Sequence, residues 1–255
     1  MKVIILAGGL GTRLSEETSM KPKPMVEIGG FPIIWHIMKT YSYYGYNEFV
    51  IALGYKGEMI KDYFLRYSQH NSNLTIDLKN DRVIKHKKNN ENWIIDLIST
   101  GSSSFTGYRI KKAMEHIGKE RVMLTYGDGL SDININQLID FHDSHKKIAT
   151  LTAVKSTARF GELQFEGSNV KKFSEKPATG QTWVNGGFFV LEPEVLKYIK
   201  EKDEPFEGNP LERLSFDGQL EGYKHESFWH AMDILRDKNT LHEMWEAKKA
   251  PWKIW

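Results

Sequence analysis

The sequence contains no cysteine, so it forms no disulfide and has no thiolate for catalysis or zinc binding. It also lacks a large excess of charge of either sign, since 35 Lys and Arg face 33 Asp and Glu and the net charge is +2. Its apolar runs, such as VIILA at 3–7 and GGFFVL at 186–191, are far shorter than the roughly 20 residues of a membrane span. We therefore expect neither a nucleic-acid nor a membrane partner.

The first residues lack the pattern of a secretion signal. Lys2 is followed at once by a core-like apolar run, with no short apolar segment that ends in a small-residue cleavage site. Together with the lack of cysteine, this predicts a cytoplasmic protein. With 255 residues, of which 40% are apolar, the chain can fill one sizeable core.

Apolar runs alternate with amphipathic segments over the first 154 residues. Runs of the kind buried on both faces of a sheet predict strands at 2–7, 48–53, 93–98, 122–126 and 149–154. Helical spacing predicts helices at 31–44 and 56–67, around Ile110 to Ile117, and around Ile135 to His142. This alternation indicates an α/β fold with a Rossmann-like, mostly parallel sheet flanked by helices.

The pattern changes after Val154. Short strands predicted at 161–165, 170–175 and 182–191 are typical of small antiparallel additions, which make the sheet mixed. The last 25 residues look helical, and the polar stretch Lys79 to Asn92 is expected to be a hairpin or a flexible loop. No repeat or Pro/Gly/Ser-rich linker divides the chain, so residues 1–255 are interpreted as one domain.

A glycine-rich turn follows the first strand. Gly8, Gly9 and Gly11 let backbone N–H groups approach phosphate oxygens, at the strand end where parallel sheets bind ligands. A dinucleotide-binding fingerprint would need glycine at Leu14, and a Walker loop would need Gly-Lys-Ser/Thr where Gly11-Thr12-Arg13 stands. The alternative is a tight strand-to-helix turn that binds no ligand.

Basic residues follow this turn. Arg13 offers a fork-shaped guanidinium, and Lys21 and Lys23 lie on the proline-stiffened segment Met20 to Met25. Such groups are what a triphosphate under attack requires. The alternative is that both lysines are ordinary solvated surface charges.

The segment Gly8-Gly9-Leu10-Gly11-Thr12-Arg13-Leu14, followed by Lys21-Pro22-Lys23-Pro24-Met25, resembles the signature of the sugar nucleotidyltransferases, also called NDP-sugar pyrophosphorylases. Glu17 stands where many members have proline. That departure, and the segment from Val26 to Met38, resemble the branch that acts as glucose 1-phosphate cytidylyltransferase. The likeness extends over essentially the whole chain.

This resemblance implies a nucleotide-diphospho-sugar transferase fold and in-line transfer of a cytidylyl group from CTP to α-D-glucose 1-phosphate, giving CDP-glucose and pyrophosphate. It also implies Mg²⁺ as cofactor and a homo-oligomer, a hexamer in the family. Residues 1–130 would form the nucleotide-binding half, and residues 131–255 would form the half that binds the sugar phosphate.

Two aspartates are candidate metal ligands. Asp128 lies between Gly127 and Gly129 at the end of a predicted strand, at the same sheet edge as the glycine-rich turn. A carboxylate there suits Mg²⁺, although an Asx-turn is the alternative. Asp233 precedes the C-terminal helix and could simply cap it, whereas the resemblance makes it the second metal ligand. We reject zinc at His230, because no other His or Cys has the required spacing.

The resemblance assigns the remaining roles. Arg13 would stabilise the leaving pyrophosphate and Lys23 would hold the α-phosphate. The nucleotide would be bound by Leu6, Ala7, Gly8, Gly9, Gly11, Thr12, Thr100, Gly101, Thr106, Arg109 and Gly127. The sugar phosphate would be bound by Gly161, Glu175, Lys176, Asn185 and Gly186. The alternatives are that Thr106 is a helix N-cap, that Arg109 is solvated and that Glu175-Lys176 is a surface pair.

Other functions remain as alternatives. A thymidylyl- or uridylyltransferase would use the same chemistry with another triphosphate. A non-catalytic, regulatory nucleotide-binding module would use the same fold. Such a module is expected to lack the catalytic groups, but the aspartates Asp128 and Asp233 and the lysines Lys23 and Lys176 are all present. A dehydrogenase is disfavoured by Leu14.

Overall fold

The computed structural model describes residues 1–88, 91–157, 162–174, 181–200 and 203–255. Four parallel strands form one end of its main sheet: β1 (Lys2–Ala7), β4 (Glu48–Leu53), β7 (Ile94–Ser99) and β8 (Val122–Tyr126). Ile5 of β1 lies between Ile51 of β4 and Thr125 of β8. The parallel pairing brings the carboxyl ends of these strands to one edge, as the alternation of strands and helices predicts.

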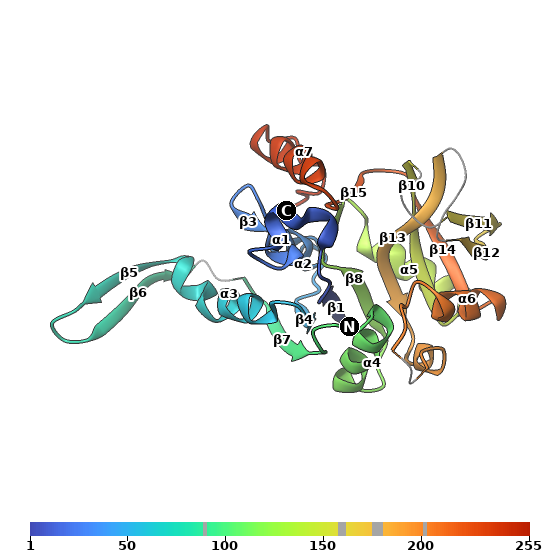
Figure 1. The fold of residues 1–255 in the computed structure, drawn as a ribbon, viewed down its shortest axis with the longest axis horizontal. Coiled ribbons are helices and arrows are strands. Elements are labelled where there is room, and N and C mark those ends of the chain that lie inside the picture. The colour runs from blue at the N-terminus through green and yellow to red at the C-terminus, as the bar shows by residue number, and fades with distance from the viewer. Residues whose placement is uncertain (89–90, 158–161, 175–180, 201–202) are drawn as a thin grey trace.

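Strand β1 is buried on both faces, which explains its unbroken apolar sequence. Val3 and Ile5 belong to one hydrophobic core together with α2 (Ile33–Tyr43), whereas Ile4 and Leu6 belong to a second core with α4 (Thr106–Ile117). A strand that contributes alternate side chains to two cores cannot carry a polar residue without burying it. Figure 1 shows α4 on one side of the parallel strands.

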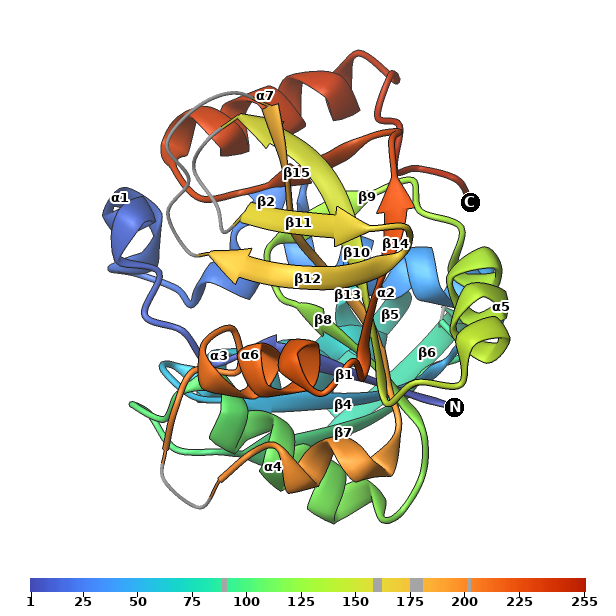
Figure 2. The same cartoon turned by 90° about the vertical axis from the view of Figure 1, so that its right-hand side faces the viewer.

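The second half of the chain extends the same sheet. Strand β13 (Gln181–Leu191) pairs antiparallel with β8 and also with β10 (Ala149–Thr157). The resulting nine-stranded sheet has the order β10-β14-β12-β11-β13-β8-β1-β4-β7, where the added strands are β11 (Glu162–Glu166), β12 (Asn169–Ser174) and β14 (Leu220–His225). The predicted mixed sheet with antiparallel additions is confirmed, and β14 is a strand that the sequence pattern did not reveal (Figure 2).

Further elements surround this sheet. The other helices are α1 (Ser15–Thr18), α3 (Gly57–His70), α5 (Ile135–His145), α6 (Asn209–Phe216) and α7 (Leu235–Glu246), with 3-10 turns at Thr12–Leu14, Lys23–Met25 and Pro193–Lys197. Short pairs join β2 (Glu27–Ile28) to β3 (Phe31–Pro32) and β9 (Gly129–Ser131) to β15 (Trp229–Ala231). No helix in the described ranges is long and apolar enough to span a bilayer.

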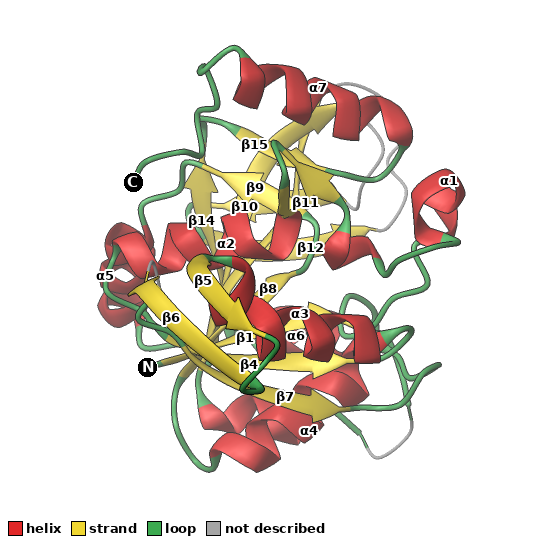
Figure 3. Ribbon diagram, turned by 90° about the vertical axis from the view of Figure 1, so that its left-hand side faces the viewer, coloured by secondary structure: helices red, strands yellow, loops and turns green. Residues whose placement is uncertain are grey.

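A two-stranded hairpin projects from the body after α3 (Figure 1, Figure 3). It consists of β5 (Ser72–Asp77) and β6 (Arg82–Lys88). A hairpin was expected near Lys79 to Asn92, and the structure shows that it begins earlier, at Ser72. Apolar residues occur both at the end of α3 and in β5, so the sequence pattern did not mark where the helix ends and the hairpin begins.

The C-terminal segment is helical only in part. Helix α7 ends at Glu246, and the chain then turns back so that Trp252 is fully buried. Its ring packs 6.1 Å from His36 and 5.6 Å from Phe228, measured between ring centroids. The expectation of a helix over all 25 final residues is wrong for residues 231–234, where Ala231 ends β15 and α7 has not yet begun. It is also wrong for residues 247–255, because burial of Trp252 requires the chain to reverse.

Candidate active site

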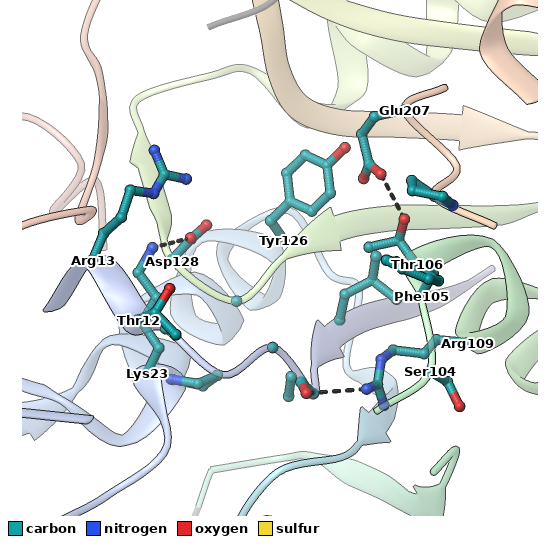
Figure 4. A pocket seen from close by; sticks show the side chains of 18 residues that line it. Thr12, Arg13, Lys23, Ser104, Phe105, Thr106, Arg109, Tyr126, Asp128 and Glu207 are labelled. Carbon is teal, nitrogen blue, oxygen red and sulfur yellow. Dashed lines mark hydrogen bonds and ion pairs between the residues drawn. The ribbon is translucent and has the colours of Figure 1, made fainter. Parts of the chain in front are cut away.

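A cavity of about 380 Å³ opens at the carboxyl ends of β1 and β8. Twelve of its lining residues were expected to bind substrate or metal, namely Leu6, Ala7, Gly8, Gly9, Gly11, Thr12, Arg13, Lys23, Thr106, Arg109, Gly127 and Asp128. Figure 4 shows Arg13, Lys23 and Asp128 at one end and Thr106, Arg109 and Glu207 at the other, with Tyr126 between them. The pocket therefore has a cationic end and a second polar end.

Lys23 links two aspartates at the cationic end. Its Nζ lies 2.6 Å from Asp128 Oδ2 and 2.7 Å from Asp233 Oδ1. Arg13 Nη1 lies 3.2 Å from the other oxygen of Asp233. Burial lowers the pKa of Lys23, but the two carboxylates more than offset this, so its pKa is raised and the ammonium stays charged.

Asp233 does not cap α7. The carboxylate of Asp237 instead accepts hydrogen bonds from the backbone N–H groups of Asp233 and Ile234, each at 3.0 Å. The Asp233 side chain is thereby left to pair with Lys23 and Arg13, which line the pocket, although Asp233 itself does not line it. Asp128 likewise directs its carboxylate to Lys23, while its backbone carbonyl accepts from Met232 N at 2.9 Å.

The two aspartates fit a magnesium ion that also binds substrate. Asp233 Oδ2 is buried and has no well-directed hydrogen bond, although Arg13 is within ion-pair distance. Mg²⁺ prefers one or two carboxylates together with phosphate oxygens and water. Within the described ranges, no three His, Cys, Asp or Glu residues form a metal-binding group. Such a pair of carboxylates therefore suits a metal whose other ligands come from substrate and solvent.

Arg109 holds the glycine-rich turn in place. Its Nη2 donates to Gly8 O at 3.0 Å, and its Nη1 donates to Gly101 O at 2.8 Å and to Thr100 Oγ1 at 2.7 Å. The side chain is only 3% exposed, so the alternative of a solvated Arg109 is wrong. A Cβ at position 8 would lie 2.2 Å from Arg109 Cζ, which explains why glycine is needed there.

Thr100 and Gly101 lie beside the main pocket and do not line it. They border a neighbouring hollow with Ser99, Ser104 and Tyr108. The hydroxyl of Thr100 donates to Leu53 O at 2.8 Å. Arg109, which lines the main pocket, connects these two residues to it.

The other polar end contains residues that the sequence did not mark. Ser104, Phe105, Tyr126, Pro205 and Glu207 all line the pocket. Tyr126 could have been found, because it directly precedes Gly127 at the end of β8. Glu207 and Pro205 come from a polar segment of the second half, where no motif or periodicity marks them.

The expected sugar-phosphate residues are only partly described. Asn185 Nδ2 donates to Tyr126 Oη at 3.0 Å, and Asn185 Oδ1 accepts from Gly187 N at 2.9 Å. Gly186 O accepts from Trp229 Nε1 at 2.8 Å. The structure thus places Asn185 next to the pocket residue Tyr126. Gly161, Glu175 and Lys176 lie outside the described residues.

Comparison with known proteins identifies the family. The sequence profile described as nucleotidyl transferase matches residues 2–234. The chain belongs to the nucleotidyl transferase family. Within this family, the glucose-1-phosphate cytidylyltransferase of Salmonella typhi is 50% identical over 256 residues, and the probable glucose-1-phosphate cytidylyltransferase of Bacillus subtilis is 44% identical. Both alignments cover 100% of each chain. The dehydrogenase alternative is therefore wrong.

Solved structures show the same fold. HddC from Yersinia pseudotuberculosis superimposes with a TM-score of 0.77 at 24% identity, covering 96% of this chain and 99% of that one. A putative glucose-1-phosphate thymidylyltransferase from Bacillus anthracis gives a TM-score of 0.76 at 18% identity, covering 98% and 95%. The expected nucleotide-diphospho-sugar transferase fold is confirmed.

Proposed function

We propose that this protein is a glucose-1-phosphate cytidylyltransferase, which transfers a cytidylyl group from CTP to α-D-glucose 1-phosphate and releases pyrophosphate. The full-length similarity to two cytidylyltransferases supports the choice of substrates. The observation that carries the proposal is the cluster of Arg13, Lys23, Asp128 and Asp233 at one end of a pocket large enough for a nucleotide.

The reaction needs positioning and charge stabilisation more than a protein nucleophile. A phosphate oxygen of glucose 1-phosphate attacks the α-phosphorus, and the bond from this phosphorus to the bridging oxygen breaks, leaving its electron pair on pyrophosphate. Lys23 holds the α-phosphate and Arg13 stabilises the leaving group. Asp128 and Asp233 would hold Mg²⁺, which offsets phosphate charge when bound.

The remaining assignments form part of the same proposal. The backbone of the glycine-rich turn, from Gly8 to Gly11, contacts the phosphates. Asn185 and Gly186 lie next to the sugar, and Gly161, Glu175 and Lys176 complete its binding site. Residues 1–130 supply most of the nucleotide site.

Pyrophosphate release tests the proposal. Purified protein is assayed with Mg²⁺, glucose 1-phosphate and CTP, dTTP or UTP in turn, and CTP is expected to give the highest kcat/KM. Arg13→Ala should lower kcat by about 10²- to 10³-fold, as expected for loss of a preorganised charge stabiliser. Arg66→Ala, at an exposed position on α3, is the matched control. No release with any triphosphate would overturn the enzymatic function, and preference for another base would overturn the cytidylyl assignment.

The hairpin supports assembly into a homo-oligomer, with the family's hexamer as the expected form. A lone two-stranded hairpin is marginally stable in water, so it needs a packing partner. Ile76 and Val83 are cross-strand neighbours that are 60% and 57% exposed. We propose that a second copy covers them. Light scattering should give a multiple of 29.5 kDa for the wild type and a smaller mass for Ile76→Asp/Val83→Asp. A monomeric wild type would contradict this.

The cytoplasmic location stays a prediction.

A further inference from the structure

The polar end of the pocket is built by two segments that are distant in the sequence. The segment Asp203–Glu207 is fastened to the start of α4 by four hydrogen bonds, three of which are donated by backbone N–H groups. Phe105 N donates to Asp203 Oδ1 at 2.8 Å, and Gly107 N donates to Glu204 O at 3.1 Å. Phe206 N donates to Thr106 Oγ1 at 2.8 Å. Glu207 is therefore held in position by its neighbours before any ligand binds.

The hydrogen bonds of Thr106 show that Glu207 acts as a hydrogen-bond acceptor. Because Thr106 Oγ1 already accepts from Phe206 N, its own hydrogen points to Glu207 Oε2, at 2.5 Å. Glu207 is thus an acceptor in this contact. A carboxylate offers about four lone pairs, so it can accept further hydrogen bonds from a ligand.

Arg109 also lies at the Glu207 end of the pocket, but its guanidinium donates to Gly8 O, Gly101 O and Thr100 Oγ1. Within the described ranges, no Lys, Arg or His forms an ion pair with Glu207, whereas Arg13 and Lys23 line the opposite end. Tyr126 lies near Glu207, and burial followed by the charge of Glu207 raises the pKa of its phenol well above 10, so the hydroxyl keeps its proton. This end therefore suits a neutral group that donates hydrogen bonds and does not suit a phosphate.

The bases of the candidate triphosphates differ at the position that such a carboxylate can read. Cytosine carries an amino group at C4, which donates, whereas uracil and thymine carry a carbonyl oxygen there, which only accepts. A glutamate accepts from the cytosine amine and repels a carbonyl oxygen. With the phosphates at the Lys23 end, the base extends toward Phe105 and Tyr126, whose rings offer apolar surfaces to it.

We propose that Glu207 is the residue that selects cytosine, by accepting a hydrogen bond from the 4-amino group of CTP. The inference rests on the proposed cytidylyltransferase function and adds a residue that determines its specificity. Thr106 is the positioning residue, since its hydroxyl orients the carboxylate. Glutamine at position 207 would keep the shape but could turn either its oxygen or its amide N–H groups toward the base.

The test compares kcat/KM for CTP and UTP in the wild type and in Glu207→Gln. The CTP-to-UTP ratio should fall by about tenfold or more in the variant, as expected for loss of a hydrogen bond to a charged group. Most of this change should come from KM. Glu207→Asp should keep a larger share of the preference, because it retains the charge. Glu212→Gln, at an exposed position on α6, is the matched control and should leave the ratio unchanged.

The inference is overturned if Glu207→Gln keeps the wild-type CTP-to-UTP ratio. If the variant keeps this ratio and loses the preference for CTP over dCTP, Glu207 recognises the ribose and not the base. Calorimetric binding of CMP and UMP provides a readout independent of turnover. If the wild type released no pyrophosphate with any triphosphate, the proposed function would fail, while equal CMP affinity in wild type and Glu207→Gln would separately refute the role of Glu207.

Discussion

Lys23 Nζ lies 2.7 Å from Asp233 Oδ1, although the two residues are 210 positions apart in the chain. The same ammonium is 2.6 Å from Asp128 Oδ2. One positive charge therefore holds together two carboxylates that would otherwise repel each other. A divalent cation at these carboxylates would compete with Lys23 for the same oxygens, which makes the lysine available for the phosphate.

Replacing Lys23 by methionine tests this competition. Lys23→Met should lower kcat by about 10²- to 10³-fold, because the α-phosphate loses its cation. Without nucleotide, the variant should also be stabilised by Mg²⁺ more than the wild type is, since the two carboxylates then have no ammonium between them. The measurement is the rise in Tm between EDTA and Mg²⁺.

The matched control is Lys21→Met, which removes a lysine that pairs with Glu27 at 3.0 Å on the surface. Its Mg²⁺-dependent rise in Tm should equal that of the wild type. An equal rise in Lys23→Met would contradict the view that lysine and metal share these oxygens.

Adjacent glycines in the phosphate-binding turn should respond differently to alanine. In Gly8→Ala the new methyl group would lie 2.2 Å from Arg109 Cζ, so the guanidinium must move and release the carbonyls that it binds. Leaving buried carbonyls without donors costs about 1–3 kcal/mol each. Urea unfolding should show a clear loss of stability.

Gly9→Ala is the control, because nothing lies within 4 Å of a Cβ at that position. Its free energy of unfolding should stay close to that of the wild type. Stability is the better readout for this pair, since both glycines line the pocket and an added methyl group would also meet a phosphate. Equal losses in the two variants would contradict a bracing role for Arg109.

Stability should fall in mild acid because His36 is buried in its neutral form. Its Nε2 donates to Ile28 O at 2.9 Å, and its Nδ1 accepts from Trp252 Nε1 at 3.3 Å. Burial is the main cause that lowers the pKa of His36 to about 4. The unfolded chain gains a proton near pH 6.5, so stability is fully present above that pH and is lost as the pH falls toward 4.

Linkage predicts a loss of about 2 kcal/mol at pH 5 relative to pH 7.5 from this residue. Urea unfolding at the two pH values measures it. His145, whose pKa is also lowered to about 4 mainly by burial, adds to the same trend in every variant. His36→Gln should therefore reduce the pH dependence of stability without abolishing it. His70→Gln, at an exposed position, should leave the pH dependence unchanged. An unchanged slope in His36→Gln would refute the assignment.

The parallel core and the cationic end of the pocket could be predicted from the sequence. Strand β1 is marked by a continuous apolar run, and its carboxyl end fixes where Arg13 and Asp128 must lie. Asp233 was predicted to be a metal ligand only through the family resemblance, because an aspartate before a helix is normally a cap. The structure resolves this ambiguity by giving the capping role to Asp237.

The polar end of the pocket could not be predicted in this way. Arg109 lies in the first turn of α4, where side chains are commonly exposed, and only the carbonyls of Gly8 and Gly101 explain its burial. Glu207 reaches the pocket because its segment hydrogen-bonds to α4. Such contacts between distant loops leave no periodic signal in the sequence.

An ion pair between Glu17 and Lys238 ties the segment after Arg13 to α7. Glu17 lies in α1 directly before Thr18, whose hydroxyl donates to Gly11 O at 2.9 Å. Breaking the pair in Lys238→Met should cost about 1 kcal/mol or less of stability, as for other partly exposed pairs. The same change should lower kcat/KM by about three- to tenfold, because Arg13 is then less well positioned.

Exchanging the two charges distinguishes loss of the Glu17–Lys238 ion pair from a general loss of packing. Glu17→Lys and Lys238→Glu should each lower kcat/KM, and the double variant should recover most of the loss because the pair is restored in reverse. Lys248→Met, an exposed lysine beyond the end of α7, is the control and should leave kcat/KM unchanged. If the double variant is no better than the worse single variant, the two side chains do not act through each other, and the position of Arg13 depends on the Thr18 hydrogen bond and on Asp233 instead.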